Sequence, residues 1–181
     1  MGYGKEGSIN KALRYIIKKT CERIRPRSYL EIGVQEGKSL SWVLDNAEIE
    51  VVVLCDTWGG TYGGSARQNP KHIQKTLSTR PKSPTTIFLN GDSKKTVPKI
   101  TMQFDMILVD GDHSERGAQA DIENSWKLLK PGGSMIIDDI NHPAHKYLFG
   151  LMAAFVNKNK GASIYEMMLD LPYGAVDIRK R

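Results

Sequence analysis

The sequence predicts an α/β fold: a doubly wound, mostly parallel sheet of seven strands with an antiparallel hairpin at its C-terminal end. Short apolar segments rich in β-branched residues alternate with amphipathic ones along the whole chain. A helical segment separates each pair of successive strands up to residue 137, which implies right-handed crossovers and parallel pairing. Only a tight turn around Pro172-Tyr173-Gly174 joins the last two strands, so this pair must be antiparallel.

Each predicted element follows from a local pattern. Helices are predicted where apolar residues recur at helical spacing, and strands where short apolar runs are nearly continuous. Ser8 is the expected cap of the first helix, and Pro26 ends that helix. The predicted helices are Ser8–Arg25, Lys38–Asn46, Lys71–Thr79, Ser93–Ile100, Ser114–Leu129 and Pro143–Asn157. The predicted strands are Ser28–Ile32, Glu50–Cys55, Thr85–Leu89, Phe104–Val109, Ser134–Ile137, Ile164–Leu169 and Ala175–Ile178.

Length and composition fit one globular domain. The chain has 181 residues, of which 40% are hydrophobic and 25% charged, the usual globular mix. We expect residues 1–27 to form an N-terminal tail and helix, and residues 28–181 to form the core of the fold. No apolar run reaches the roughly 20 residues of a membrane span, and the first residues lack the apolar core of a signal peptide. Cys21 and Cys55 lie in a predicted helix and strand, so we expect a reducing, cytoplasmic location without disulfides.

The net charge of +6 is concentrated between Lys11 and Arg27 and in the last three residues. A basic balance can attract nucleic acid. Aromatic residues are not interleaved with these charges as single-strand binding requires, so we expect a solvated basic helix and a small-molecule substrate instead. Only residues 57–70 and the first 27 residues are available as a lid, which indicates an open site or one completed by a second copy of the chain.

Polar or acidic residues follow each of the first five predicted strands. Ligands of such sheets bind beyond the carboxyl ends of the strands, and core packing alone would not place polar groups there. The sequence therefore predicts one binding site at this edge. The segments that would form it are Glu31–Ser39, Asp56-Thr57-Trp58, Asn90-Gly91-Asp92-Ser93, Asp110-Gly111-Asp112-His113 and Asp138-Asp139.

The first turn favours a nucleoside ligand without a pyrophosphate. Gly33 and Gly37 allow the backbone to approach a ligand closely and to open a helix. The dinucleotide fingerprint needs glycine where this chain has Gln35, which argues against an NAD-dependent reductase. Glu31 suits a ligand with a cationic amine.

Two further acids suit a nucleoside. Asp56 follows Gly33 by 23 residues and ends the second strand, where an acid can accept both hydroxyls of a ribose. Asp92 ends the third strand and can accept from an adenine amino group, or it can cap the helix that begins near Ser93.

These segments form a recognisable set. They comprise Glu31-x-Gly-x-x-x-Gly-x-Ser39, Asp56, Gly91-Asp92, Phe104–His113 and Leu128-Leu-Lys-Pro-Gly-Gly133. From about Tyr29 to Asn141 the chain resembles the class I S-adenosylmethionine-dependent methyltransferases, most of all the metal-dependent O-methyltransferases of the catechol type and of the macrocin type, which act on sugars.

The resemblance implies a Rossmann-like fold with S-adenosylmethionine as the cofactor. The first-turn residues would hold its methionine part and Asp56 its ribose, with Asp92 near the adenine. Trp58 would lie near the adenine face or in the loop above it. The cofactor-binding residues implied or expected are Glu31, Gly33, Gly37, Ser39, Asp56, Trp58, Asp92, Ser93 and Asp110.

Acids at the ends of the fourth and fifth strands predict a metal site. Asp110, Asp138 and Asp139 should follow neighbouring strands about 4.8 Å apart, and three converging carboxylates repel unless a cation lies among them. Hard oxygen ligands suit Mg²⁺ or Mn²⁺. The metal-dependent relatives also place ligands here, although the catechol type has Asn where this chain has Asp139.

A metal at this place can bind a vicinal diol and lower the pKa of one hydroxyl. His113, three residues after Asp110, is the predicted base, with His142 and His145 as rivals. This choice matches the macrocin type rather than the catechol type, which uses a lysine. We therefore predict an O-methyltransferase acting on a sugar or another diol. The alternatives are an NAD-type reductase, a non-catalytic nucleotide-binding domain, and an RNA methyltransferase that uses the basic N-terminal helix.

Overall fold

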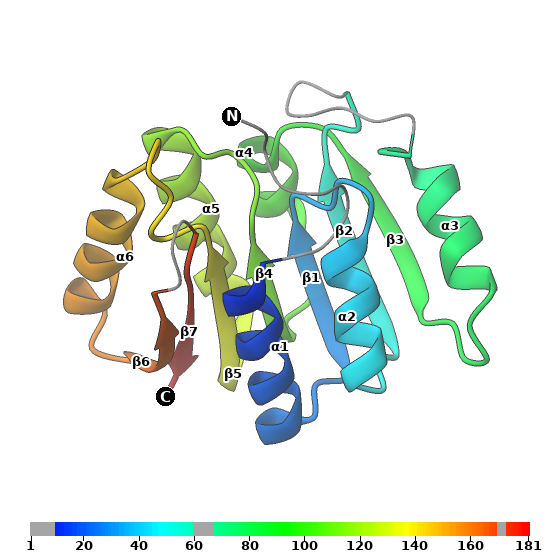
Figure 1. Cartoon of the computed structure of the whole chain (residues 1–181), viewed down its shortest axis with the longest axis horizontal. Coiled ribbons are helices and arrows are strands. Elements are labelled where there is room, and N and C mark those ends of the chain that lie inside the picture. Colours follow the sequence, from blue (N-terminus) through cyan, green and yellow to red (C-terminus); the bar gives the residue numbers. More distant parts are fainter. Residues whose placement is uncertain (1–9, 60–66, 170–172) are drawn as a thin grey trace.

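The computed structural model describes residues 10–59, 67–169 and 173–181, and it shows alternating helices and strands (Figure 1). The helices are α1 (Lys11–Ile24), α2 (Lys38–Asn46), α3 (Pro70–Ser78), α4 (Ser93–Thr96), α5 (Glu115–Leu128) and α6 (Tyr147–Lys158), with a short 3₁₀ helix η1 (Val97–Lys99) after α4. The strands are β1 (Ser28–Ile32), β2 (Val51–Asp56), β3 (Thr85–Asn90), β4 (Phe104–Val109), β5 (Leu129–Asp138), β6 (Ala162–Met168) and β7 (Ala175–Lys180).

The strands form one sheet in the order β3-β2-β1-β4-β5-β7-β6. Strands β1 to β5 are parallel to one another, and β7 is antiparallel to both β5 and β6. The predicted mixed sheet with a C-terminal hairpin is therefore confirmed. The chain runs outward from β1 in one direction through β2 and β3, and then in the other from β4. The carboxyl ends of β1 and β4 consequently meet at the point where the strand order reverses, which is where ligands bind in such sheets.

Two hydrophobic clusters cover the two faces of the sheet. One joins the sheet to α1, α2 and α3 through residues such as Ile16, Val43 and Ile73, and the other joins it to α5 and α6 through Ile122 and Met152. In Figure 1, α1 and α2 lie in front of the sheet and α5 lies behind it. Because both faces are covered, every residue of β1 is buried. The same holds for β2 from Val52 on, as its nearly continuous apolar run predicted.

Several element boundaries differ from the sequence prediction, and those of α1, β5 and α6 bear on the site. α1 begins at Lys11, where the Asn10 side chain accepts from the backbone N–H of Leu13 and forms the cap; Ser8, the predicted cap, lies outside the described residues. β5 begins at Leu129 and includes the Pro-Gly-Gly segment, because Leu129 pairs with Phe104 before the register shifts. α6 begins only at Tyr147, so His145 lies in a loop and not on a helix. Within the described part of the chain, we find no helix with the length and hydropathy of a membrane span.

Candidate active site

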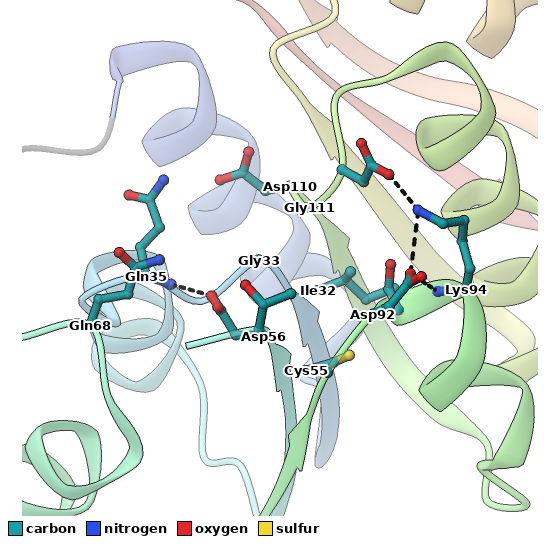
Figure 2. Close-up of a pocket in the computed structure, with 14 residues that line it drawn as sticks. Ile32, Gly33, Gln35, Cys55, Asp56, Gln68, Asp92, Lys94, Asp110 and Gly111 are labelled. Carbon is teal, nitrogen blue, oxygen red and sulfur yellow. Dashed lines mark hydrogen bonds and ion pairs between the residues drawn. The ribbon is translucent and has the colours of Figure 1, made fainter. Parts of the chain in front are cut away.

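A cavity of about 340 Å³ lies at the carboxyl ends of β1 to β4 (Figure 2). It is located where the sequence analysis placed a nucleoside ligand. Most of its polar lining comes from the turns that follow these strands. The lining residues are Ile32, Gly33, Gln35, Cys55, Asp56, Thr57, Gln68, Gly91, Asp92, Ser93, Lys94, Asp110, Gly111 and Asp112.

The two glycines of the first turn are both required by the backbone. Gly33 has φ +86°, and a Cβ there would lie 1.9 Å from the carbonyl oxygen of Asp110. Gly37 has φ +74° and begins α2, where a Cβ would lie 2.7 Å from Cδ1 of Ile73. No L side chain fits these positions without displacing its neighbours. Gly33 thus allows the turn after β1 to touch the end of β4 and to form part of the cavity wall.

Asp56 connects the ends of β1 and β2. Its Oδ2 accepts from the backbone N–H groups of Val34 (2.8 Å) and Gln35 (2.9 Å), and its Oδ1 accepts from the N–H of Trp58 (2.7 Å). These bonds fix the carboxylate at the cavity wall, and Figure 2 shows the one from Gln35. Each carboxylate oxygen can accept more than one bond, so a ligand hydroxyl can still be bound.

Glu31 and Ser39 are buried and bind each other. The Ser39 hydroxyl donates to Oε1 of Glu31, and the Tyr29 hydroxyl donates to Oε2 (2.8 Å). Glu31 is fully buried, and this burial raises its pKa to about 7, although the two hydroxyl donors oppose the shift. The resemblance implied that both residues contact the methionine part of the cofactor, but neither is among the residues that line the cavity.

The predicted adenine side contains a cation that the sequence analysis missed. Asp92 caps α4 by accepting from the backbone N–H of Lys94 (3.0 Å) and pairs with the ammonium of the same residue (3.3 Å). That ammonium also donates to Oδ2 of Asp112 at 2.5 Å. Ser93 is buried in the lining, beside Asp121, and burial raises the pKa of Asp121 to about 6.

Trp58 packs away from the cavity. Its ring meets Phe88 edge to face at a centroid distance of 6.0 Å and contacts the hydrophobic cluster under α2. The residue has φ +53°, and it does not belong to the cavity lining. Its side chain therefore packs on the core, and the place near the adenine that the resemblance implied stays a prediction.

Beyond the cavity, Asp110, His113 and Asp139 come together. Nε2 of His113 lies 3.3 Å from Oδ2 of Asp139 and 3.6 Å from Oδ1 of Asp110. One ligand atom from each residue lies within 4.8 Å of the other two. Asp139 reaches this position because it adopts φ +58° directly after β5, a left-handed conformation that Asp tolerates better than most residues.

Asp138, the third predicted ligand, points to a different partner. Both of its oxygens accept from Nδ2 of Asn10, at 3.0 and 3.1 Å. Asn10 therefore caps α1 with one end of its amide and holds Asp138 with the other. The described structure thus groups two of the three predicted acids with His113 and leaves Asp138 adjacent to them.

The electrostatics of this cluster are unfavourable without a cation. Burial raises the pKa of Asp110 well above its usual range, and repulsion from Asp138 and Asp139 raises it further. Burial, and then repulsion from Asp139, raises the pKa of Asp138 to about 7. The hydrogen bond with Asp139 raises the pKa of His113, the group that partly balances these charges. The carboxylates of Asp110 and Asp139 are hard oxygen donors of the kind that a divalent cation prefers, and the imidazole of His113 lies beside them.

The rival histidines form a row of stacked rings next to His113. The His145 ring lies 5.3 Å from that of His113 and 4.8 Å from that of His142. His142 also lies 5.4 Å from Tyr173. The hydroxyl of Tyr147 donates to the carbonyl of His113 and so ties the start of α6 to this loop. His113, the predicted base, is the histidine within salt-bridge distance of Asp110 and Asp139.

Several lining residues were not singled out from the sequence. Gln68 carried no recognisable pattern. Lys94 could have been noticed as a charged residue that directly follows the predicted site segment after the third strand. Asn10 carried no signal, because its partner Asp138 lies 128 residues away.

Comparison with known proteins assigns the family. The family model described as "Methyltransferase domain" matches residues 30–140, more than half of the chain. No curated protein matches the sequence significantly.

Solved structures show the same fold at low identity. An O-methyltransferase from Bacillus cereus in complex with S-adenosylhomocysteine (SAH) has 16% identity and a TM-score of 0.72, with 98% of this chain and 84% of that chain covered. The SAH-bound methyltransferase PaMTH1 of Podospora anserina has 15% identity and a TM-score of 0.69, over 96% and 80%. The N-methyltransferase NodS of Bradyrhizobium japonicum, also with SAH, has 12% identity and a TM-score of 0.66, over 93% and 85%. From the family match, and in agreement with this fold, the chain belongs to the class I S-adenosylmethionine-dependent methyltransferases.

Proposed function

We propose that this methyltransferase is a divalent-metal-dependent O-methyltransferase that acts on a small hydroxylated substrate, a sugar or another vicinal diol. The fold alone does not select the accepting atom, because both O- and N-methyltransferases share it. The selection rests on the residues beyond the cofactor cavity.

One observation carries the proposal: Asp110 belongs to both parts of the site. It lines the cavity and also forms a group with His113 and Asp139. A cofactor in the cavity and a cation among these side chains would therefore be close neighbours. An amine acceptor needs no such cation, whereas a hydroxyl must lose a proton with a high pKa.

The residues of the cavity fit the cofactor. When bound, S-adenosylmethionine supplies a methyl group that is attached to a sulfonium sulfur, and this sulfur keeps the electron pair of the carbon–sulfur bond when the methyl group is transferred. Asp56 would accept from the ribose hydroxyls, since its oxygens are fixed at the cavity wall. Asp92 would accept from the adenine amino group on the opposite side. Gly33 would leave room for the methionine part.

The acids fit a divalent cation by their chemistry. Asp110 and Asp139 would hold Mg²⁺ or Mn²⁺, and Asp138, which Asn10 holds next to them, would join them as a further ligand. When bound, the cation supplies a Lewis acid that orients two neighbouring hydroxyls and lowers the pKa of one of them. His113 would accept the proton that this hydroxyl loses on methylation. Tyr147 would fix the loop that carries His113.

Methyl transfer from radiolabelled S-adenosylmethionine tests the proposal. The purified protein is offered a panel of catechols, free sugars, nucleotide sugars and primary amines, with Mg²⁺ or Mn²⁺ and then with excess chelator. We expect methylation of at least one diol, which chelator abolishes and added metal restores. Full activity in chelator, or methylation of amines alone, would overturn the proposal. Asp110→Asn serves as the inactive control.

A further inference from the structure

The cavity contains one side chain that connects two of its walls. Lys94, on α4, reaches Asp92 at the end of β3 and Asp112 in the turn after β4. The dashed lines from Lys94 in Figure 2 mark these contacts. Its ammonium lies 2.5 Å from Asp112 and 3.3 Å from Asp92, so it bridges two carboxylates that otherwise repel each other.

The bridge constrains how Asp92 can turn. Oδ1 of Asp92 contacts both the ammonium and the backbone N–H of Lys94. Two contacts to the same oxygen fix the plane of the carboxylate and leave Oδ2 for a ligand. A carboxylate held in this way accepts from an amino group without first having to be ordered, which lowers the entropic cost of binding.

The other end of the bridge is fixed by the fold. Oδ1 of Asp112 accepts from the backbone N–H of Ser114 at 2.9 Å. Its carboxyl carbon lies where a Cβ on Gly117 would be, at 2.1 Å, so only glycine at that position of α5 leaves room for it. Asp112 is thus an anchor that is fixed in the turn leading into α5.

We infer that Lys94 is a positioning residue that, anchored by Asp112, orients Asp92 and thereby makes the cavity selective for a purine with an amino group at C6 over one with a carbonyl. The inference rests on the proposed placement of adenine next to Asp92. A site built to accept from an amino group rejects an analogue that presents an acceptor there, because two acceptors then face each other. Lys94 itself does not need to touch the ligand.

Calorimetric titration with SAH and with S-inosylhomocysteine, in which a carbonyl replaces the amino group, tests the inference. We expect the wild type to prefer SAH. Lys94→Met keeps the length of the side chain but removes its charge. The affinity for SAH should fall about five- to tenfold, since one oriented charge-assisted hydrogen bond depends on the lysine charge. The affinity for S-inosylhomocysteine should fall by less than about twofold, because this ligand gains nothing from an oriented Asp92. Lys95→Met, an exposed neighbour on α4 outside the cavity lining, is the matched control and should change neither affinity.

The outcomes separate the inference from its premise. Equal losses for both ligands in Lys94→Met would show a merely structural role, and no loss would show none; either result overturns the inference. The effect should also vanish in an Asp112→Asn background if Asp112 is the anchor, and an undiminished effect there would contradict the anchoring. If Asp92→Ala keeps the preference for SAH, the adenine placement itself is wrong. Failure of the wild type to bind SAH would instead refute the proposed function.

Discussion

On the β1–β3 side of the site the chain itself satisfies the carboxylates, whereas on the β4–β5 side they face one another. Asp56 accepts three backbone N–H groups, and Glu31 accepts two hydroxyls. Asp110 and Asp139 share one imidazole, that of His113, and repulsion among the acids contributes to the raised pKa of Asp110. We call these the cofactor half and the acidic half.

The difference indicates two kinds of ligand. Bonds that are already formed hold the cofactor half in shape before any ligand arrives, which suits a large organic ligand that is bound through many hydrogen bonds. The acidic half keeps a concentration of negative charge that a divalent cation would neutralise. The halves meet where Gly33 allows the β1 turn to touch Asp110. A substitution away from this contact changes one half only, so the function of the other half should stay measurable.

The largest expected effect of a single substitution is in the acidic half. His113→Ala should lower kcat by about 10²–10⁴-fold if this histidine takes the proton, while SAH affinity stays unchanged because the ring is not part of the cavity lining. Steady-state kinetics and calorimetry measure the two quantities, and His72→Ala on α3 is the control. A small loss in His113→Ala with a large one in His142→Ala would move the base to the loop after β5. Small losses in both would leave the cation as the sole activator.

In the cofactor half we expect a smaller effect, which should lower the affinity for SAH. Asp56→Asn keeps an acceptor for the first turn but loses charge, so SAH affinity should fall tenfold or more, in line with about 1.5–3 kcal/mol per charge-assisted bond. Metal affinity should not change. Calorimetry measures both, and a thermal unfolding curve confirms that the variant folds. Unchanged SAH affinity would remove Asp56 from the ribose and would weaken the distinction between the halves.

The sheet and the location of the site followed from the sequence because their causes are local. Apolar runs such as that of β2 specify strands buried on both faces, and alternation with helices specifies parallel pairing. The acids at the strand ends then had to meet at one edge. Asp56, Asp110 and Asp139 are located where these rules predict.

The remaining details depend on contacts between distant segments. Asp138 turns toward Asn10, 128 residues away, and Lys94 bridges to Asp112 across two strand ends. No periodicity encodes such pairs. Trp58 was ambiguous for a related reason, since its packing on Phe88 depends on where the loop after β2 turns. The Pro-Gly-Gly segment favours a turn by propensity, yet the pairing of Leu129 with Phe104 draws it into β5.

Calorimetric titration of Mn²⁺ into the wild-type protein and into Asp139→Asn tests most directly the central claim, that the acidic half is a cation site distinct from the cofactor half. The account predicts a single Mn²⁺ in the wild type and binding at least about tenfold weaker in Asp139→Asn, because a charged ligand is lost. SAH should bind the two proteins equally well. Equal Mn²⁺ affinity in both proteins, or no Mn²⁺ binding by a wild type that binds SAH, would contradict the account.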